Sequence, residues 1–177
     1  AAAGVGAYLL VRDQAGGNGS GSGNGSAEPA ASTAAITVSD FDPFGDDGFE
    51  DPEGAPNVVD GNDGTIWSTQ HYTNFSEKPG VGLALTLDPT SSVRTVTVST
   101  RQRGWSGAIY LSTAEASTLR ALPDWGEPVA TGSDLGESHT FTIDPSQSAR
   151  SVLVWFTSLP AHDGGQQWLE VTEVRLA

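Results

Sequence analysis

The stretch that decides the fold is residues 57–68, which read Asn-Val-Val-Asp-Gly-Asn-Asp-Gly-Thr-Ile-Trp-Ser. Two apolar residues lead into a run of Asp, Gly and Asn from Asp60 to Gly64, residue types that adopt tight and left-handed turns. The chain leaves this run through β-branched Thr65 and aromatic Trp67. The turn carries carboxylate, amide and hydroxyl oxygens, which are the ligands that a hard cation prefers. The stretch therefore predicts a tight loop, with oxygen ligands for a cation, immediately before a strand.

The pattern of hydrophobic residues predicts an all-β domain. Alternating apolar and polar residues indicate strands at residues 83–87, 93–100, 108–112, 139–143, 152–157 and 168–176. Helical spacing occurs only at residues 113–122, where Pro123 would end the helix. Many short strands separated by Gly and Pro turns are typical of an antiparallel β-sandwich.

The run from Asp60 through Asn62 and Thr65 to Trp67 resembles the signature of discoidin-like domains, also called coagulation factor 5/8 type C domains. These domains are similar to family 32 carbohydrate-binding modules. The resemblance implies that the sandwich is a jelly roll of the galactose-binding-domain-like type. In such a fold we expect Trp67 to pack in the core rather than to stack on a ligand.

The same resemblance implies a structural Ca²⁺ at this loop. Asp60, Asn62 and Thr65 match the motif position by position, and a Glu near the C-terminus would complete the site. Glu173 is the matching residue, with Glu170 as the alternative. The other interpretation is a loop held by side-chain-to-backbone hydrogen bonds, without a metal ion.

Composition limits the classes of partner. The chain has 177 residues, with 22 acidic residues against 8 Lys and Arg, for a formal net charge of −14. Nucleic acid and anionic lipid need basic surfaces, so neither is expected as a partner. The chain has no Cys, which excludes disulfides and thiolate metal sites.

The length and local composition predict three segments. We expect residues 1–12 to be the end of a truncated transmembrane helix, with a disordered Ala-rich leader as the alternative. Residues 13–35 are rich in Gly, Ser and Asn and predict a flexible linker. Residues 36–177 form the predicted discoidin-like domain.

Ligands of discoidin-like domains usually meet the loops at one end of the sandwich. The resemblance therefore points to polar and aromatic residues in such loops, namely His71, Tyr72, Arg101, Arg103 and Trp105. An exposed Trp105 would stack on a sugar ring, and the arginines would bond hydroxyls or carboxylates. The alternative is an ordinary surface loop in which Trp105 folds back onto the sandwich.

The sequence does not predict an enzyme. Its three His residues are scattered, and it has neither a Gly-x-Ser-x-Gly motif nor a Cys nucleophile. Its carboxylates fall mostly in turns, where solvated side chains are the default.

Two further motifs are similar to a narrower, actinobacterial group of discoidin-like domains. They are Asp-Pro-Phe-Gly at residues 42–45, followed by Asp and Gly, and Lys-Pro-Gly-Val-Gly-Leu at residues 78–83. Domains with these marks lie outside the membrane in MviN-type peptidoglycan-precursor flippases and in some Ser/Thr protein kinases. The resemblance implies a membrane-anchored, extracytoplasmic domain that binds a cell-wall glycan or precursor. The alternative is a structural or protein-interaction domain that binds an envelope protein and no sugar.

Overall fold

The computed structural model describes residues 34–177. The predicted membrane-helix end at residues 1–12, and all but the last two residues of the predicted linker at 13–35, lie outside the described residues. Within residues 34–177, no helix is long and apolar enough to span a bilayer.

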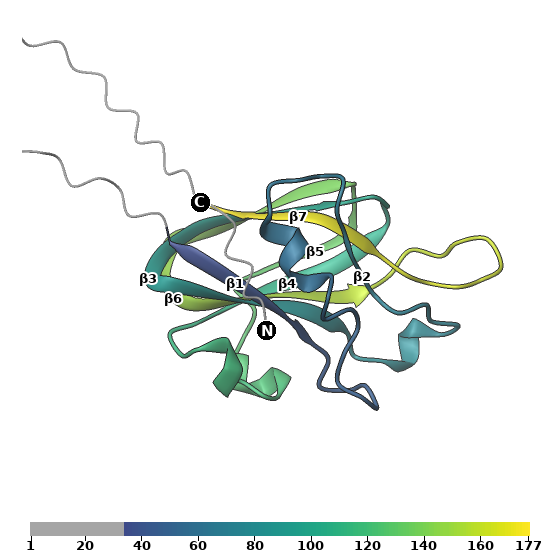
Figure 1. Cartoon of the computed structure of the whole chain (residues 1–177), viewed down its shortest axis with the longest axis horizontal. Helices are drawn as coiled ribbons and strands as arrows, with labels where there is room; N and C mark the ends of the chain where they lie inside the picture. The colour runs from purple at the N-terminus through teal and green to yellow at the C-terminus, as the bar shows by residue number, and fades with distance from the viewer. Residues whose placement is uncertain (1–33) are drawn as a thin grey trace, which may run out of the picture.

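The described chain is a seven-stranded antiparallel sheet folded into a sandwich, which confirms the predicted fold class (Figure 1). The strands follow the order β2-β7-β3-β6-β4-β5, and β1 pairs with β3. Their bounds are β1 Ala35–Phe41, β2 Trp67–Ser68, β3 Val81–Thr100, β4 Trp105–Ser112, β5 Ala130–Leu135, β6 Ser138–Ser158 and β7 Glu170–Leu176. Four 3-10 turns complete the described elements: η1 Ala55–Val59, η2 Phe75–Glu77, η3 Ala116–Thr118 and η4 Leu122–Trp125.

The long strands β3 and β6 each contribute to both layers of the sandwich. The first half of β3 pairs with β1 and the end of β6, and its second half pairs with β7 and the start of β6. The pairing of β3 with β6 shifts register between Thr86 and Ser91, where one half gives way to the other. Leu85 from the first half and Val98 from the second belong to one buried cluster, so the two halves face each other across the core.

The predicted helix at residues 113–122 is wrong. This stretch contains the short turn η3, after which Leu119 takes an extended conformation. Local bonds replace a helical ladder: the Ala114 N–H donates to the Ser112 hydroxyl, and the Thr118 hydroxyl donates to the Glu115 carbonyl. The apolar residues of the stretch pack instead on the outer face of the sheet, in a second cluster that includes Trp155.

Candidate functional site

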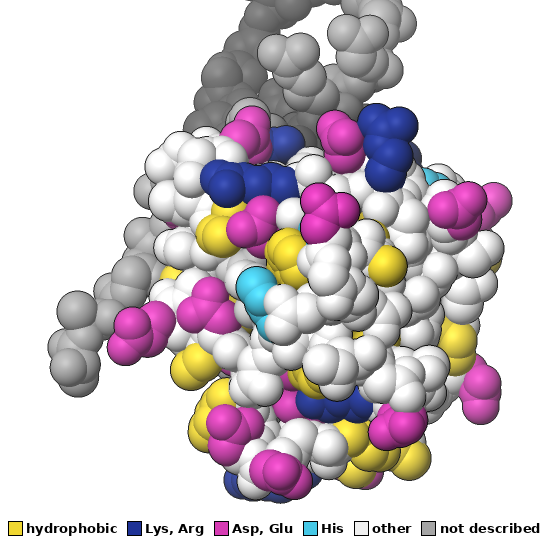
Figure 2. All heavy atoms as spheres, turned by 90° about the vertical axis from the view of Figure 1, so that its right-hand side faces the viewer, with side chains coloured by type: hydrophobic (Ala, Val, Ile, Leu, Met, Phe, Trp, Pro, Cys, Tyr) yellow, Lys and Arg dark blue, Asp and Glu magenta, His cyan; other side chains and the backbone are white. Residues whose placement is uncertain are grey.

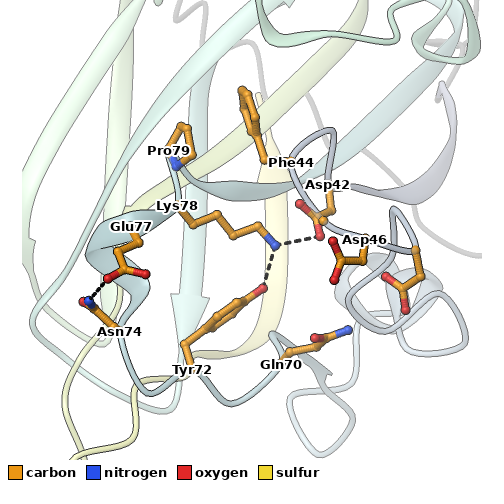
Figure 3. Close-up of a pocket in the computed structure, with 11 residues that line it drawn as sticks. Asp42, Phe44, Asp46, Gln70, Tyr72, Asn74, Glu77, Lys78 and Pro79 are labelled. Atoms are coloured by element: carbon orange, nitrogen blue, oxygen red, sulfur yellow. Dashed lines mark hydrogen bonds and ion pairs between the residues drawn. The ribbon is translucent and has the colours of Figure 1, made fainter.

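A pocket of about 620 Å³ lies between the loop that follows β1 and the segment that connects β2 to β3 (Figure 3). This volume is within the range of small-molecule sites. Two sequence motifs meet in it, because Asp42 and Phe44 belong to the first and Lys78 and Pro79 to the second. The full lining is Asp42, Phe44, Gly45, Asp46, Asp47, Gln70, Tyr72, Asn74, Glu77, Lys78 and Pro79.

Asp40 organises the loop that forms one side of the pocket. Its carboxylate accepts the backbone N–H groups of Glu50 at 2.9 Å and Asp51 at 2.7 Å, and so closes the loop after β1. It also accepts the indole N–H of Trp67. The buried Trp67 ring stacks on Phe156, with ring centroids 5.9 Å apart, so the loop is anchored to the sandwich core.

Glycines at both motifs permit the close approach of these segments. A Cβ atom at Gly45 would overlap the Asp42 carboxylate, which fills the space above that residue. A Cβ atom at Gly80 would overlap the Phe156 carbonyl and the Trp155 ring, and Gly80 has a φ of +151°. Only glycine fits at residue 80, because the overlap there is with backbone, whereas a side chain at residue 45 would have to displace the Asp42 carboxylate.

A buried ion-pair network lies at the base of the pocket. The Lys78 ammonium contacts the Asp42 carboxylate at 2.7 Å and the Glu50 carboxylate at 3.3 Å, and it donates to the Tyr72 hydroxyl at 2.9 Å. The Tyr72 hydroxyl donates in turn to Glu50. The carboxylates of Asp42 and Glu50 are 1% and 0% exposed, and Lys78 is 14% exposed. The network therefore fixes four side chains that come from distant parts of the sequence.

Burial sets the protonation of this network. It raises the pKa of the Glu50 carboxyl group, although hydrogen bonds from Tyr72 and the charge of Lys78 oppose the shift. Burial, followed by the hydrogen bond and negative charge of Glu50, also raises the pKa of the Tyr72 phenol far above its ordinary value. Tyr72 therefore stays protonated and remains a donor to Glu50.

One wall of the pocket is aromatic and the opposite rim is polar. The Phe44 ring is 47% exposed, and its centroid lies 6.1 Å from that of the buried Trp155. On the other side, the Asn74 amide donates to the Glu77 carboxylate at 2.7 Å. Figure 3 shows the Lys78 side chain running between these two sides. The arrangement offers one accessible ring face with hydrogen-bonding groups around it.

The five predicted ligand residues do not converge. Tyr72 lines the pocket, whereas His71 stacks on Trp168, with ring centroids 4.3 Å apart. Arg101 donates to the Gly64 carbonyl, and Arg103 pairs with Glu137 at 3.1 Å on the surface.

Trp105 is not an exposed stacking residue. Its side chain is 0% exposed, and its indole N–H donates to the Gly136 carbonyl at 2.9 Å. The predicted sugar contact of Trp105 is therefore wrong, and its alternative, a ring folded onto the sandwich, is what the structure has. Gly104, with a φ of +87°, turns the chain so that Trp105 enters β4 with its ring in the core.

The Asp60 loop is closed by its own hydrogen bonds. The Asp60 carboxylate accepts from the Asn62 N–H at 2.8 Å and from the Thr65 hydroxyl at 2.9 Å. The Asn62 side-chain oxygen accepts the Gly64 N–H at 3.0 Å. Among residues 34–177, no group of three or more His, Cys, Asp and Glu side chains is arranged to hold a metal ion.

Glu173 lies buried beside this loop, and Glu170 does not. Burial raises the pKa of Glu173; the positive charge of Arg175 opposes the shift, and the negative charges of Asp60 and Asp63 add to it. The Glu173 Oε2 atom has no hydrogen-bond partner among the described residues. The Glu170 carboxylate accepts instead from the Gln102 amide at 2.9 Å. Of the two Glu residues, only Glu173 combines a place beside the loop with a buried carboxylate oxygen that accepts no hydrogen bond from the described residues; the Arg175 guanidinium lies 3.8 Å from that oxygen.

Sequence reasoning missed most of the pocket. Phe44 and Lys78 stood in motifs that were noted for their resemblance and given no chemical role. Lys78 is the first Lys or Arg after Arg12, and it follows nine acidic residues between Asp40 and Asp63. A lone cation after so many acids was a usable signal, since it predicts an ion pair with some of them.

No protein-family model matches the chain. Two galactose oxidases of Gibberella zeae are 29% and 28% identical to it over 129 residues, which is 67% of this chain. The match spans only 17% of the length of these curated relatives.

Solved structures with the same fold include carbohydrate-binding modules. A family 32 module from Clostridium perfringens NanJ, solved with galactose, has a TM-score of 0.53 at 19% identity, over 80% of this chain and 92% of that one. A chitosan-binding module from a Paenibacillus sp. IK-5 chitosanase/glucanase has a TM-score of 0.56 at 15% identity, over 79% and 92%. At these identities the likeness shows the fold: the described chain is a β-sandwich of the type found in family 32 carbohydrate-binding modules.

Proposed function

We propose that this chain is a non-catalytic recognition domain that binds a carbohydrate in the pocket beside Phe44. The observation that carries the proposal is the half-exposed Phe44 ring, which borders a pocket of about 620 Å³ with amide, carboxylate and ammonium groups around it. A sugar ring has an apolar face that packs on an aromatic ring, while its hydroxyls need fixed polar partners. The galactose, mannuronic acid and chitosan ligands named for modules of the same fold support this class of ligand.

The finer proposal is an extracytoplasmic role in an actinobacterial cell envelope. It rests on the two motifs that build the pocket, at residues 42–45 and 78–83, and on the predicted membrane anchor and linker before the domain. The ligand would then be a cell-wall glycan or peptidoglycan precursor, and the domain would be tethered to the extracytoplasmic face of the cell membrane. The second candidate is an envelope-protein partner, which is favoured by a second exposed ring on the same loop, Phe49, at 53% exposure.

Phe44→Ala tests the sugar site directly. We expect it to weaken glycan binding at least about tenfold, as loss of a central aromatic contact does, and to leave the melting temperature within a few degrees. The measurement is titration of the purified chain with hits from a glycan and muropeptide array.

Phe49→Ala is the matched control, because Phe49 is equally exposed on the same loop but does not line the pocket. It should bind glycans as the unchanged protein does. Equal affinity of the Phe44→Ala variant and the unchanged protein would contradict the proposed pocket. If no glycan on the array binds, binding to an envelope protein becomes the favoured function.

We further propose that Ca²⁺ binds at the Asp60 loop, with oxygen ligands from Asp60, Asn62, Thr65 and Glu173. The buried Oε2 atom of Glu173 supports the proposal, because it accepts no hydrogen bond within residues 34–177 and its ion pair with Arg175 is long, at 3.8 Å. A buried carboxylate oxygen without a close donor is destabilising, and a cation beside it would remove that cost. The ion would stabilise the folded state, since only that state brings residue 173 to the loop.

Calcium should therefore raise the melting temperature, and the increase should be larger at pH 7.5 than at pH 5. The pKa of Glu173 is raised in the folded state, so its contribution to stability is present at low pH and is lost as pH rises above about 4.5 through the folded pKa. Calcium favours the charged carboxylate and would offset this loss. Thermal unfolding in chelator and in millimolar Ca²⁺ measures the effect. Glu170→Gln should keep it and Glu173→Gln should lose it; no shift at either pH would leave a hydrogen-bonded turn without metal.

A further inference from the structure

We infer that the carbohydrate bound beside Phe44 carries an unsubstituted, protonated amine. This inference rests on the proposed function and names the class of ligand. It follows from the charges of the pocket, from one buried carboxylate in its lining, and from the arrangement of its acids.

The pocket carries an excess of negative charge. Four acidic side chains line it, against one cationic side chain, Lys78. The four are Asp42, Asp46, Asp47 and Glu77. The Lys78 ammonium is already bonded to Asp42, Tyr72 and a fifth carboxylate, that of Glu50. It is therefore not free to bind an anionic ligand, and an acidic sugar would meet like charges on both sides of the pocket.

Asp42 supplies an independent observation. Its side chain lines the pocket and is 1% exposed, and only its Oδ2 atom is bonded to Lys78. Its Oδ1 atom has no hydrogen-bond partner within residues 34–177. A buried carboxylate oxygen without a donor is costly, and a cationic N–H donor satisfies it better than a neutral one does. Figure 3 places Asp42 and Asp46 on the same side of the pocket, opposite Glu77 and Asn74.

The acids around the pocket suit an organic cation, because they lie on opposite sides of it and do not converge on one point. This arrangement matches a sugar whose ring packs on Phe44 while its ammonium group faces the carboxylates.

The test compares two ligands that differ only at nitrogen. Glucosamine and N-acetylglucosamine oligomers of the same length are titrated into the full chain, at low and at high salt. We expect the amine form to bind at least about tenfold tighter at low salt, with the preference shrinking as salt screens the charges. Asp46→Asn should weaken the amine form by about threefold to fivefold and leave the acetylated form nearly unchanged.

The overall charge requires its own control. On the face shown in Figure 2, acidic side chains are widely spread and basic ones are few, so any cation is attracted to this surface. Asp163→Asn makes the same change of charge at an exposed residue outside the pocket lining. It should have no effect; an effect equal to that of Asp46→Asn would overturn the pocket assignment.

The remaining outcomes separate this inference from the proposed function. If the acetylated oligomers bind as well as the amines and Phe44→Ala abolishes that binding, the pocket binds sugar and the amine inference is wrong. If lysine oligomers bind as tightly as glucosamine oligomers, the pocket recognises only positive charge, and the inference that it recognises a sugar ring is wrong. If no oligomer binds, the amine inference is contradicted, and the glycan array with Phe44→Ala decides whether the pocket binds another sugar.

Discussion

Lys78→Met should destabilise the domain by about 3–5 kcal/mol, because it leaves two buried carboxylates without their cation. Asp42 and Glu50 are almost completely buried, and Lys78 is the cation that contacts both. Methionine keeps most of the apolar stem of lysine, so the loss reports the charge rather than the packing. Urea unfolding at pH 7, followed by tryptophan fluorescence, measures it.

The loss of stability caused by Lys78→Met should depend on pH in a defined direction. The pKa of Glu50 is already raised in the folded protein, so the carboxyl group favours folding when it is protonated. Without Lys78 this tendency strengthens, and the destabilisation should shrink as pH falls from 7 toward 4.5. A deficit that is constant over this range would show that the charge is not its cause.

Arg103→Met is the matched control for this change. Arg103 also forms an ion pair, with Glu137 at 3.1 Å, but both side chains are largely exposed. Exposed pairs contribute about 0–1 kcal/mol, because water and salt screen them. Equal losses from Lys78→Met and Arg103→Met would contradict the idea that the network under the pocket is a buried element of the fold.

Most of the strands could be predicted, although β1 and β5 were not, and the continuity of the long strands could not. The alternation at residues 83–87 and 93–100 predicts two strands, since the residues between them, with Pro89, read as a turn. In the structure they are one strand, β3, and the interruption is a shift of register where the chain passes from one layer to the other. Local sequence shows the interruption of the pattern but not which neighbours each half will meet.

β5 was missed because its pattern is weak. In Ala130–Leu135 only Leu135 is buried, and the strand includes Gly132 and Asp134, which are poor strand formers. It exists because β4 offers an edge with which it pairs, from Trp105 to Ile109. A strand that is stabilised by its neighbour leaves little signal in its own residues.

The pocket could be predicted only in part, because its residues are brought together by contacts between segments that are far apart in the sequence. Tyr72 was among the predicted ligand residues and does line the pocket. Trp105 was placed in a loop because Arg, Gly and Ser surround it, yet it is the first residue of β4 and its ring packs in the core. The side that a strand residue faces depends on where the strand begins, and a one-residue difference reverses it. The ion pairs of Lys78 join residues 28 and 36 positions away, a separation that no local pattern encodes.

Trp105→Ala and Trp67→Ala should each destabilise the domain by about 3–5 kcal/mol, as truncation of a buried Trp does. Both rings are fully buried, and both contact Phe156, with centroid distances of 5.6 Å from Trp105 and 5.9 Å from Trp67. Both indole N–H groups are bonded inside the domain, to the Gly136 carbonyl and the Asp40 carboxylate. Each variant therefore leaves a cavity and removes the donor of a polar group that is partly buried.

The two variants should nevertheless differ at the pocket. Trp67 bonds Asp40, whose carboxylate also holds the backbone of Glu50 and Asp51, so its loss should loosen the loop that carries Phe44. Trp105 has no such link, and at a temperature where Trp105→Ala is still folded it should bind glycan as the unchanged protein does. Trp168→Ala, at a partly exposed ring, is the control and should cost only about 1 kcal/mol. Thermal unfolding and glycan titration of the three variants give the comparison. A Trp105→Ala variant that stays fully stable but loses glycan binding would show that the sugar binds at the loop before β4. It would contradict the proposed pocket beside Phe44.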